Sequence, residues 1–129
     1  MSYVIYDLSY INECIIRYND VGGNGSVISS DRSSVLNVIT NNYIHDNPNA
    51  VAIKAQNATI TANTIKNNRH GIRINDGTFL ISNNTISHNT GYNNSVAGIS
   101  SSSLRDGTVV TISNNLIFEN GSTGIMLRS

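Results

Sequence analysis

The sequence predicts an all-β fold, a three-sided solenoid of parallel β-strands, on three observations. A nine-residue motif, I-x-x-N-x-I-x-x-N, occurs five times and starts at residues 11, 39, 60, 81 and 112, with Cys for the first Asn in the first copy. A strand-like segment follows each copy, and no stretch of the chain has helical periodicity. Repeats of about 20–30 residues are typical of solenoids, in which each repeat buries its apolar face against its neighbours. We therefore expect about five coils in a single domain, residues 1–129.

Stacked copies of the motif align two polar columns. The first column is Cys14, Asn42, Asn63, Asn84 and Asn115, and the last column is Asn19, Asn47, Asn68, Asn89 and Asn120. Asn side chains that stack in adjacent coils can hydrogen-bond to one another. We therefore interpret the two columns as asparagine ladders with a structural role. Cys14 is then a small buried group that replaces Asn in the first coil.

Each motif is expected to form two short strands around a tight corner. In the fourth copy Ile81 ends one strand, Asn83 and Asn84 turn, and Thr85 begins the next strand. Asn is the non-glycine residue that best tolerates the left-handed backbone region that such a corner needs.

Third strands are expected at residues 26–29, 51–53, 71–74, 98–101 and 124–127. Most of them contain the pattern Gly-Ile. Period-two alternation turns Ile72 and Ile74 inward and Arg73 outward. We place Lys54 two positions further along its strand, in a column with Asn75.

The main alternative fold is a leucine-rich repeat, whose L-x-x-L-x-L-x-x-N pattern has a similar length. The fourth motif position here is Asn or Cys, where that repeat needs a buried Leu. The pattern therefore favours the β coil. Neither end carries a cap over its terminal coil, as a solenoid needs. We expect the chain to be a fragment or C-terminal part of a longer protein, or to cover its ends as a homo-oligomer such as a trimer.

Composition excludes several classes of function. Eight basic and eight acidic residues cancel, and only 12% of residues are charged, so we expect no nucleic-acid partner. One Cys excludes an internal disulfide framework and the two-Cys metal motifs. We expect no metal and no cofactor. No signal peptide and no run of about 18 apolar residues is present, so we expect no membrane insertion.

The I-x-x-N-x-I-x-x-N…G-I-x-I unit resembles the repeat of the pectate-lyase-like right-handed parallel β-helices, from about Ser9 to Leu127. That group includes carbohydrate-binding and sugar-hydrolase relatives and many cell-surface and viral tail proteins. The resemblance implies a right-handed parallel β-helix with an asparagine ladder. It also implies that the Gly-Ile-x-Ile strands and the loops entering them line a glycan groove.

Seven polar residues are the candidate substrate-binding residues. Two of them belong to the column just before the last Asn of each motif, which flanks the loop into the third strand. Basic groups suit the carboxylates of uronic or sialic acids, and a Tyr ring suits stacking on a sugar. The residues expected to rim one groove are Asp46, Lys54, His70, Arg73, Asp76, His88 and Tyr92.

Catalysis is weighed on two chemistries, and no catalytic residue is assigned. A glycoside hydrolase needs two carboxylates about 5–10 Å apart, and Asp46 and Asp76 from neighbouring coils are the pair on offer. The paired-acid motifs of polygalacturonases are missing; only Arg69-His70-Gly71 resembles their H-G element. A β-eliminating lyase needs a base, such as Arg73 or Lys54, and often Ca²⁺ held by several acids. The eight acids are scattered over different coils.

The sequence therefore favours a non-catalytic β-helix module that binds or presents to polysaccharide. We expect such a module in an extracellular, cell-surface or virion protein of the viral tail spike type. Two alternatives stay open. One is a small or truncated polysaccharide lyase, hydrolase or epimerase, and the other is a purely structural solenoid spacer.

Overall fold

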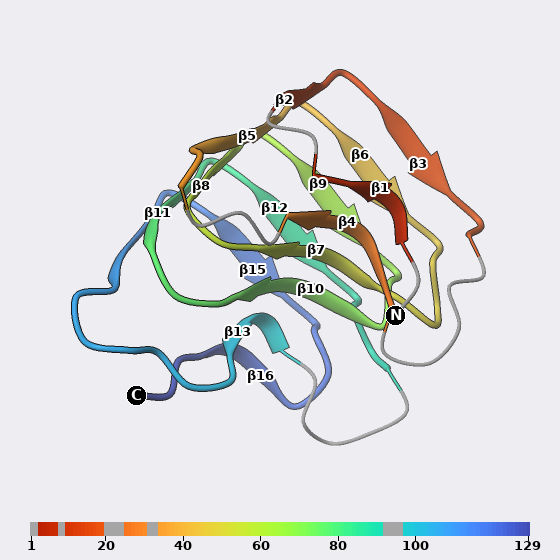
Figure 1. Ribbon diagram of the computed structural model, residues 1–129. Helices are drawn as coiled ribbons and strands as arrows, with labels where there is room; N and C mark the ends of the chain where they lie inside the picture. Colours follow the sequence, from red (N-terminus) through yellow and green to blue (C-terminus); the bar gives the residue numbers. More distant parts are fainter. Residues whose placement is uncertain (1–2, 8–9, 20–24, 31–33, 92–96) are drawn as a thin grey trace.

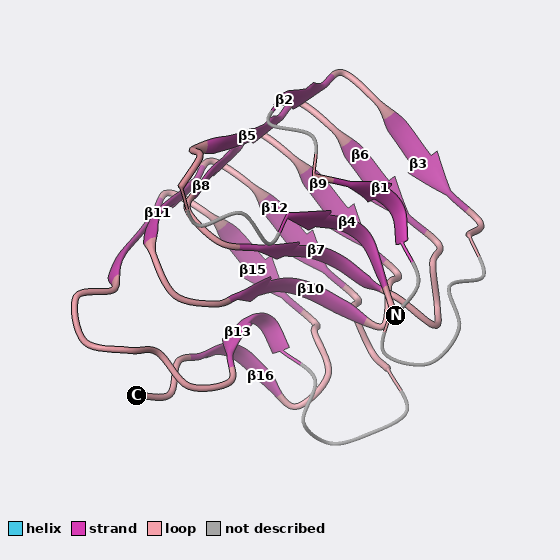
Figure 2. Cartoon of the chain, viewed as in Figure 1, coloured by secondary structure: helices cyan, strands magenta, loops and turns pink. Residues whose placement is uncertain are grey.

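The computed structural model describes residues 3–7, 10–19, 25–30, 34–91 and 97–129. Its strands form three parallel sheets that wrap around one core (Figure 1). No helix occurs in these ranges (Figure 2). The predicted all-β, three-sided solenoid is confirmed. A leucine-rich repeat has a single parallel sheet, so the three sheets exclude that fold.

Each coil contributes one strand to each sheet. The five motif copies stack through about four full turns. Sheet A consists of β1 (Tyr3–Tyr6), β4 (Ser26–Ser30), β7 (Val51–Ala55), β10 (His70–Ile74), β13 (Ala97–Ser101) and β16 (Thr123–Met126). Sheet B consists of β2 (Tyr10–Asn12), β5 (Asn37–Thr40), β8 (Ala58–Thr61), β11 (Thr78–Ser82) and β14 (Val109–Ser113). Sheet C consists of β3 (Ile15–Arg17), β6 (Tyr43–His45), β9 (Thr64–Lys66), β12 (Thr85–Ser87) and β15 (Leu116–Phe118).

The core consists mainly of isoleucine columns. The motif has two Ile positions, and the third strand has one more. Each of these Ile residues pairs in register with its copy in the next coil, which gives three columns that face one another inside the solenoid. Burying such side chains removes apolar surface from water and is the main favourable term in folding. The fully buried columns are Ile39, Ile60 and Ile81; Ile44, Ile65 and Ile86; and Ile53, Ile72 and Ile99.

Both asparagine ladders form as predicted. In the first ladder the backbone N–H of each residue donates to Oδ1 of the Asn in the next coil, for example Asn42 to Asn63 at 2.9 Å. Its Nδ2 donates to the same oxygen at 3.0 Å. The second ladder repeats this pattern from Asn68 to Asn89, at 3.0 and 3.1 Å. The prediction that Cys14 is buried is wrong, because it is half-buried. Cys14 joins the ladder through its backbone N–H, which donates to Asn42 Oδ1 at 3.0 Å, while its Sγ donates to the carbonyl oxygen of Asn12 at 3.3 Å.

The corners use left-handed backbone at the residue just before each ladder position. Asn83 has this conformation, as expected, with φ 57°. Ala62 and Glu13 occupy the same corner in other coils with φ 56° and 54°. At the second corner the left-handed residues are Tyr18, Asp46, Asn67, His88 and Glu119, with φ between 50° and 56°. The ladder itself therefore fixes the corners, since residues with little left-handed preference also adopt them.

The glycine of the third strand allows sheets A and C to approach each other. A Cβ on Gly71 would lie 2.2 Å from the carbonyl oxygen of Gly98 and 2.9 Å from Cγ2 of Ile86. A Cβ on Gly98 would meet the carbonyl oxygen of Gly124 at 2.8 Å. These contacts leave no room for a larger residue in the middle coils.

A third corner, between sheets A and B, is not evident from the sequence. Asn37 Nδ2 donates to the carbonyl oxygens of Gln56 and Asn57 at 2.8 and 3.1 Å. Asn57 Oδ1 in turn accepts from the backbone N–H of Thr78 at 2.7 Å. These bonds join three successive coils, but the residues stand at irregular spacing, so no motif predicts them.

Candidate functional site

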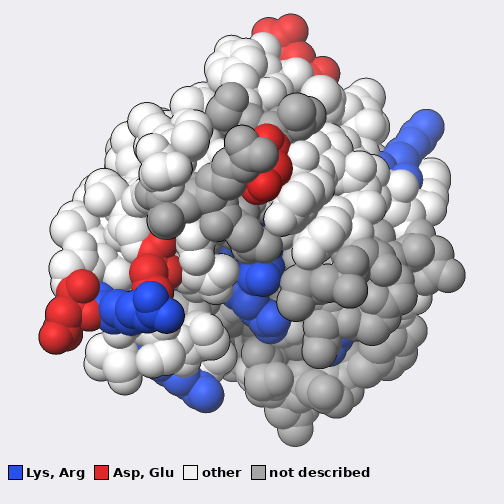
Figure 3. Space-filling model, viewed as in Figure 1, with Lys and Arg blue, Asp and Glu red and all other residues white. Residues whose placement is uncertain are grey.

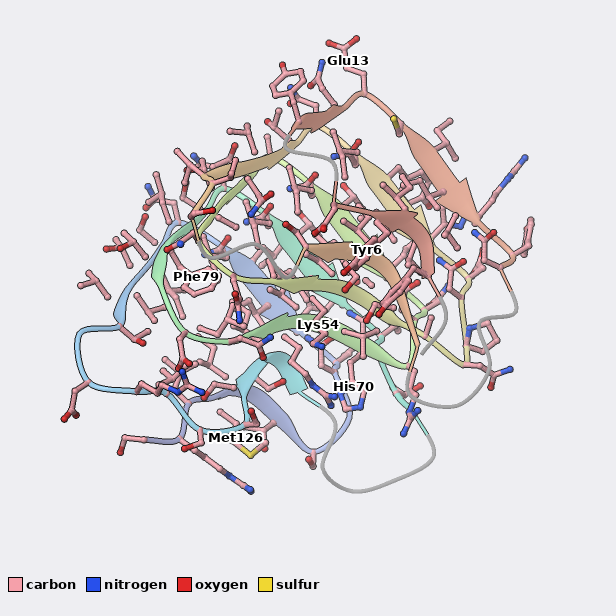
Figure 4. All side chains as sticks on the ribbon, viewed as in Figure 1. Tyr6, Glu13, Lys54, His70, Phe79 and Met126 are labelled. Carbon is pink, nitrogen blue, oxygen red and sulfur yellow. The ribbon has the colours of Figure 1, made fainter. Side chains whose placement is uncertain are left out.

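Three basic side chains gather on the outer face of sheet A, and we call Lys54, His70 and Arg73 the cation cluster. Lys54 of β7 pairs directly with Arg73 of β10 in the parallel register. Nη2 of Arg73 lies 3.4 Å from Nε2 of His70. Lys and Arg atoms gather in the middle of this face (Figure 3), and Lys54 and His70 lie over the same part of sheet A (Figure 4). The structure thus brings together three of the seven predicted residues.

The register of Lys54 differs from the prediction. Lys54 stands in the column of Arg73, whereas the sequence analysis placed it with Asn75. The backbone N–H of Asn75 bonds to the carbonyl oxygen of Ala55, one residue further on. The error arises because β7 lacks the glycine that marks the start of the pattern in β10, β13 and β16. The correction places the two cations side by side.

Burial makes the cation cluster electrostatically unusual. His70 is 4% exposed. Burial, followed by the charges of Arg73 and Arg69, lowers the pKa of His70 from 6.5 to about 4. Burial and Arg69 also lower the pKa of Arg73. Among the described residues no carboxylate pairs with Arg73. The cluster therefore combines a desolvated cation with a neutral imidazole, a pairing that a negative charge would stabilise.

Several buried polar atoms around the cluster have no hydrogen-bond partner in the described part of the chain. They include Nδ1 of His70 and the hydroxyls of Ser26 and Ser29. Ser29 pairs in register with Lys54, and Ser100 pairs with Arg73. Buried polar atoms normally have a hydrogen-bond partner, because a buried donor or acceptor without one costs about 1–3 kcal/mol of stability. These unpaired atoms lie on sheet A and are shielded from solvent in the structure.

Asp46 and His88 lie elsewhere, at the corner between sheets C and A. Asp46 Oδ2 lies 2.7 Å from Nδ1 of His45, and Oδ1 accepts a hydrogen bond from Nδ2 of Asn67 at 2.9 Å. The bonds from Asn67 and His45 lower the pKa of Asp46. Nε2 of His88 lies 2.6 Å from Oε2 of Glu119. The corner column thus contains two polar side-chain contacts between neighbouring coils, Asp46 with Asn67 and His88 with Glu119.

Three adjoining hollows follow this column, and we call them together the corner groove. Their volumes are about 570, 280 and 460 Å³. Asn67 lines all three of them. Tyr18 stands at one end and Phe118 at the other. The sequence analysis identified the column but not the groove, which also requires Pro48 and Asn49 of the following loop.

Asp76 and Tyr92 do not join either group. Asp76 lies just after the far end of β10. Its Oδ2 accepts from Nε of Arg105 at 3.1 Å, and its Oδ1 accepts from the backbone N–H of Arg105 at 2.8 Å. A five-residue strand separates Asp76 from the corner of Asp46, a length of about 15 Å or more. The two carboxylates therefore do not flank one glycosidic bond. Tyr92 lies outside the described residues.

We also searched the described residues for a metal-binding group and for a membrane-spanning helix. Within them no three His, Cys, Asp or Glu side chains gather as ligands for a metal ion. The same ranges contain no helix that is long and apolar enough to span a bilayer.

Comparison with protein families identifies one match. A family model described as a right handed beta helix region matches residues 3–129, nearly the whole chain. Comparison with curated proteins and with solved structures gave no match.

Proposed function

Because the chain belongs to the right-handed β-helix family, we propose that it is a polysaccharide-binding module and that its cation cluster receives the acidic groups of the glycan. A cell-surface or virion protein is the setting that suits such a module. The carrying observation is the pair of Arg73 and His70 on sheet A, 3.4 Å apart and without a carboxylate partner among the described residues.

The chemistry of the pair suits an oxyanion. Arg presents a planar fork of N–H donors that matches carboxylate geometry. His70 adds a donor at Nδ1 in the tautomer that carries its proton there. Lys54 stands on the neighbouring strand, in register with Arg73, so its charge adds to the same potential. An anion bound to Arg73 offsets the repulsion between Arg73 and Arg69.

Binding without catalysis is the form of the proposal that the geometry supports. A hydrolase needs two carboxylates across the scissile bond, and no carboxylate of the described residues pairs with Arg73 or His70. Asp46 and Asp76, the pair that the sequence offered, lie at opposite ends of the sheet A strands.

The test is calorimetric titration of the chain with hexagalacturonate. We expect binding that weakens about tenfold or more in Arg73→Ala, since a charge-assisted bidentate contact is lost. Arg105→Ala is the matched control, because Arg105 is 86% exposed and pairs with Asp76 away from the cluster. Equal affinity in wild type and Arg73→Ala would refute the proposal. Release of unsaturated or reducing sugar ends would instead support an enzyme.

A further inference from the structure

We propose that the corner groove is a second binding site, distinct from the cation cluster, that takes uncharged sugar residues of the same polysaccharide. The inference rests on the proposed function for the class of ligand, but it uses a different set of residues. The ligand that satisfies both sites is a heteropolysaccharide in which acidic and neutral sugars alternate or adjoin.

The shape of the groove fits a linear polymer. The first hollow includes Tyr18 of the first coil, and the last includes Phe118 of the fifth coil. Asn67 belongs to all three hollows, so they adjoin one another at this residue. Parallel coils are about 4.8 Å apart. A ligand in the groove therefore meets one corner residue for every coil that it crosses.

The polar lining is held in place before any ligand arrives. Asp46 is fixed by His45 and Asn67 through the contacts at 2.7 and 2.9 Å. The ladder residues Asn47 and Asn68 follow Asp46 and Asn67 directly and bond to each other at 2.8 Å. Preorganised groups lose little freedom when they bind. Oδ1 of Asn67, which receives no hydrogen bond from the described residues, stays available to a sugar hydroxyl.

The groove carries charges of both signs, so its charge does not select for acidic sugars. Asp46 is ionised at neutral pH because its hydrogen bonds from Asn67 and His45 lower its pKa. Glu119 places a second carboxylate next to His88 at the other end. Lys66, which also lines the groove, offsets the charge of Asp46, so the lining has no excess of positive charge to attract an anionic ligand. The hydroxyls of a neutral sugar, by contrast, donate well to carboxylate and amide oxygens.

Exposed aromatic rings stand at both ends of the groove. Tyr18 is 71% exposed and Phe118 is 39% exposed. The ring of Tyr18 is oriented by edge contact with His45 at 6.1 Å between centroids and by the Arg17 guanidinium at 5.3 Å. A rigid ring with an apolar face and a polar tip suits the apolar face of a pyranose.

The groove also adjoins the cation cluster. Asn67 precedes His70 by three residues in the same coil. Gly91 lines the middle hollow, and its backbone N–H donates to the carbonyl oxygen of Arg69 at 3.0 Å. One polysaccharide molecule can therefore place neutral sugars in the corner groove and an acidic group on Arg73.

The test compares three oligosaccharides by calorimetric titration: cellohexaose, hexagalacturonate and a hyaluronan octasaccharide, in which glucuronate and N-acetylglucosamine alternate. Tyr18→Ala and Asn67→Gly alter the groove, and glycine suits the left-handed backbone of Asn67 at φ 54°. We expect each variant to bind cellohexaose about tenfold more weakly. Arg73→Ala should bind cellohexaose as wild type does, and the hyaluronan octasaccharide should lose affinity in both kinds of variant.

The matched control is Tyr10→Ala, because Tyr10 is 63% exposed but lies on sheet B. The inference is overturned if cellohexaose does not bind wild type, or if it binds the groove variants equally well. If Tyr18→Ala weakens the binding of cellohexaose while Arg73→Ala leaves the affinity for hexagalacturonate unchanged, the groove is supported and the anion site of the proposed function is refuted. The reverse result leaves the anion site and removes the groove.

Discussion

Oδ1 of Asn84 accepts two hydrogen bonds from Asn63, one from the backbone N–H at 2.9 Å and one from Nδ2 at 3.0 Å. Asn63 Oδ1 accepts the same two bonds from Asn42. Each ladder side chain thus satisfies the backbone of the coil before it while its own backbone is satisfied by the coil after it. Because these amides are buried, the ladder couples the stability of successive coils.

Asn63→Ala should lower the free energy of unfolding by about 3 kcal/mol or more, because it removes several buried hydrogen bonds and leaves the Asn42 amide without its acceptor. Cys14→Ala should cost less than about 1 kcal/mol, since its backbone N–H is kept and its half-buried sulfur makes one weak hydrogen bond, to the carbonyl oxygen of Asn12 at 3.3 Å. Urea unfolding followed by far-UV circular dichroism measures both. Equal costs would contradict the direction of the ladder.

Ala62→Gly should stabilise the protein by about 0.5–1 kcal/mol, because Ala62 is exposed and has φ 56°, which costs energy for a residue with a Cβ. Asn83→Ala at the equivalent corner, with φ 57°, should have the opposite sign. Melting temperatures of the two variants test the pair. A loss of stability in Ala62→Gly would show that the corner is not strained.

Gly71→Ala should destabilise the fold by about 3 kcal/mol or more, because its Cβ would meet backbone oxygen at 2.2 Å, which the packed coil cannot relieve. Gly124→Ala is the matched control. Its Cβ would meet only Cγ2 of Ile117, at 3.6 Å, an ordinary contact. Similar unfolding midpoints for the two variants would contradict the close approach of Gly71 on β10 to Gly98 on β13.

His70 should make stability depend on pH. Its pKa is about 4 in the folded chain and 6.5 as a free side chain, so between these values the unfolded chain binds a proton that the folded chain does not. Stability should therefore fall as pH drops from 6.5 to 4, by up to about 3 kcal/mol, and this loss should level off below pH 4. His70→Gln should flatten that part of the profile, because it removes the buried imidazole. An unchanged slope in His70→Gln would contradict the buried imidazole.

The repeat made the architecture predictable, because residues such as Ile60 and Asn63 recur at positions that only stacking in register can satisfy. The same repeat does not predict that Lys54 pairs with Arg73, because β7 lacks the glycine from which the register is counted. Asp76 could not be assigned to Arg105 from sequence, because the two residues meet across coils through loops of unequal length. The corner groove depends in the same way on loop residues, such as Pro48, that follow no repeat.

The central claim is that function lies on the cation cluster of sheet A and not on the regular ladder. The most direct measurement is a ¹H–¹⁵N NMR titration of the labelled chain with hexagalacturonate. The account predicts that the largest shift changes fall on Lys54, His70 and Arg73 and their strand neighbours, while sheet B residues such as Thr59 stay unchanged. Shift changes centred on sheet B, or none at saturating ligand, would contradict it.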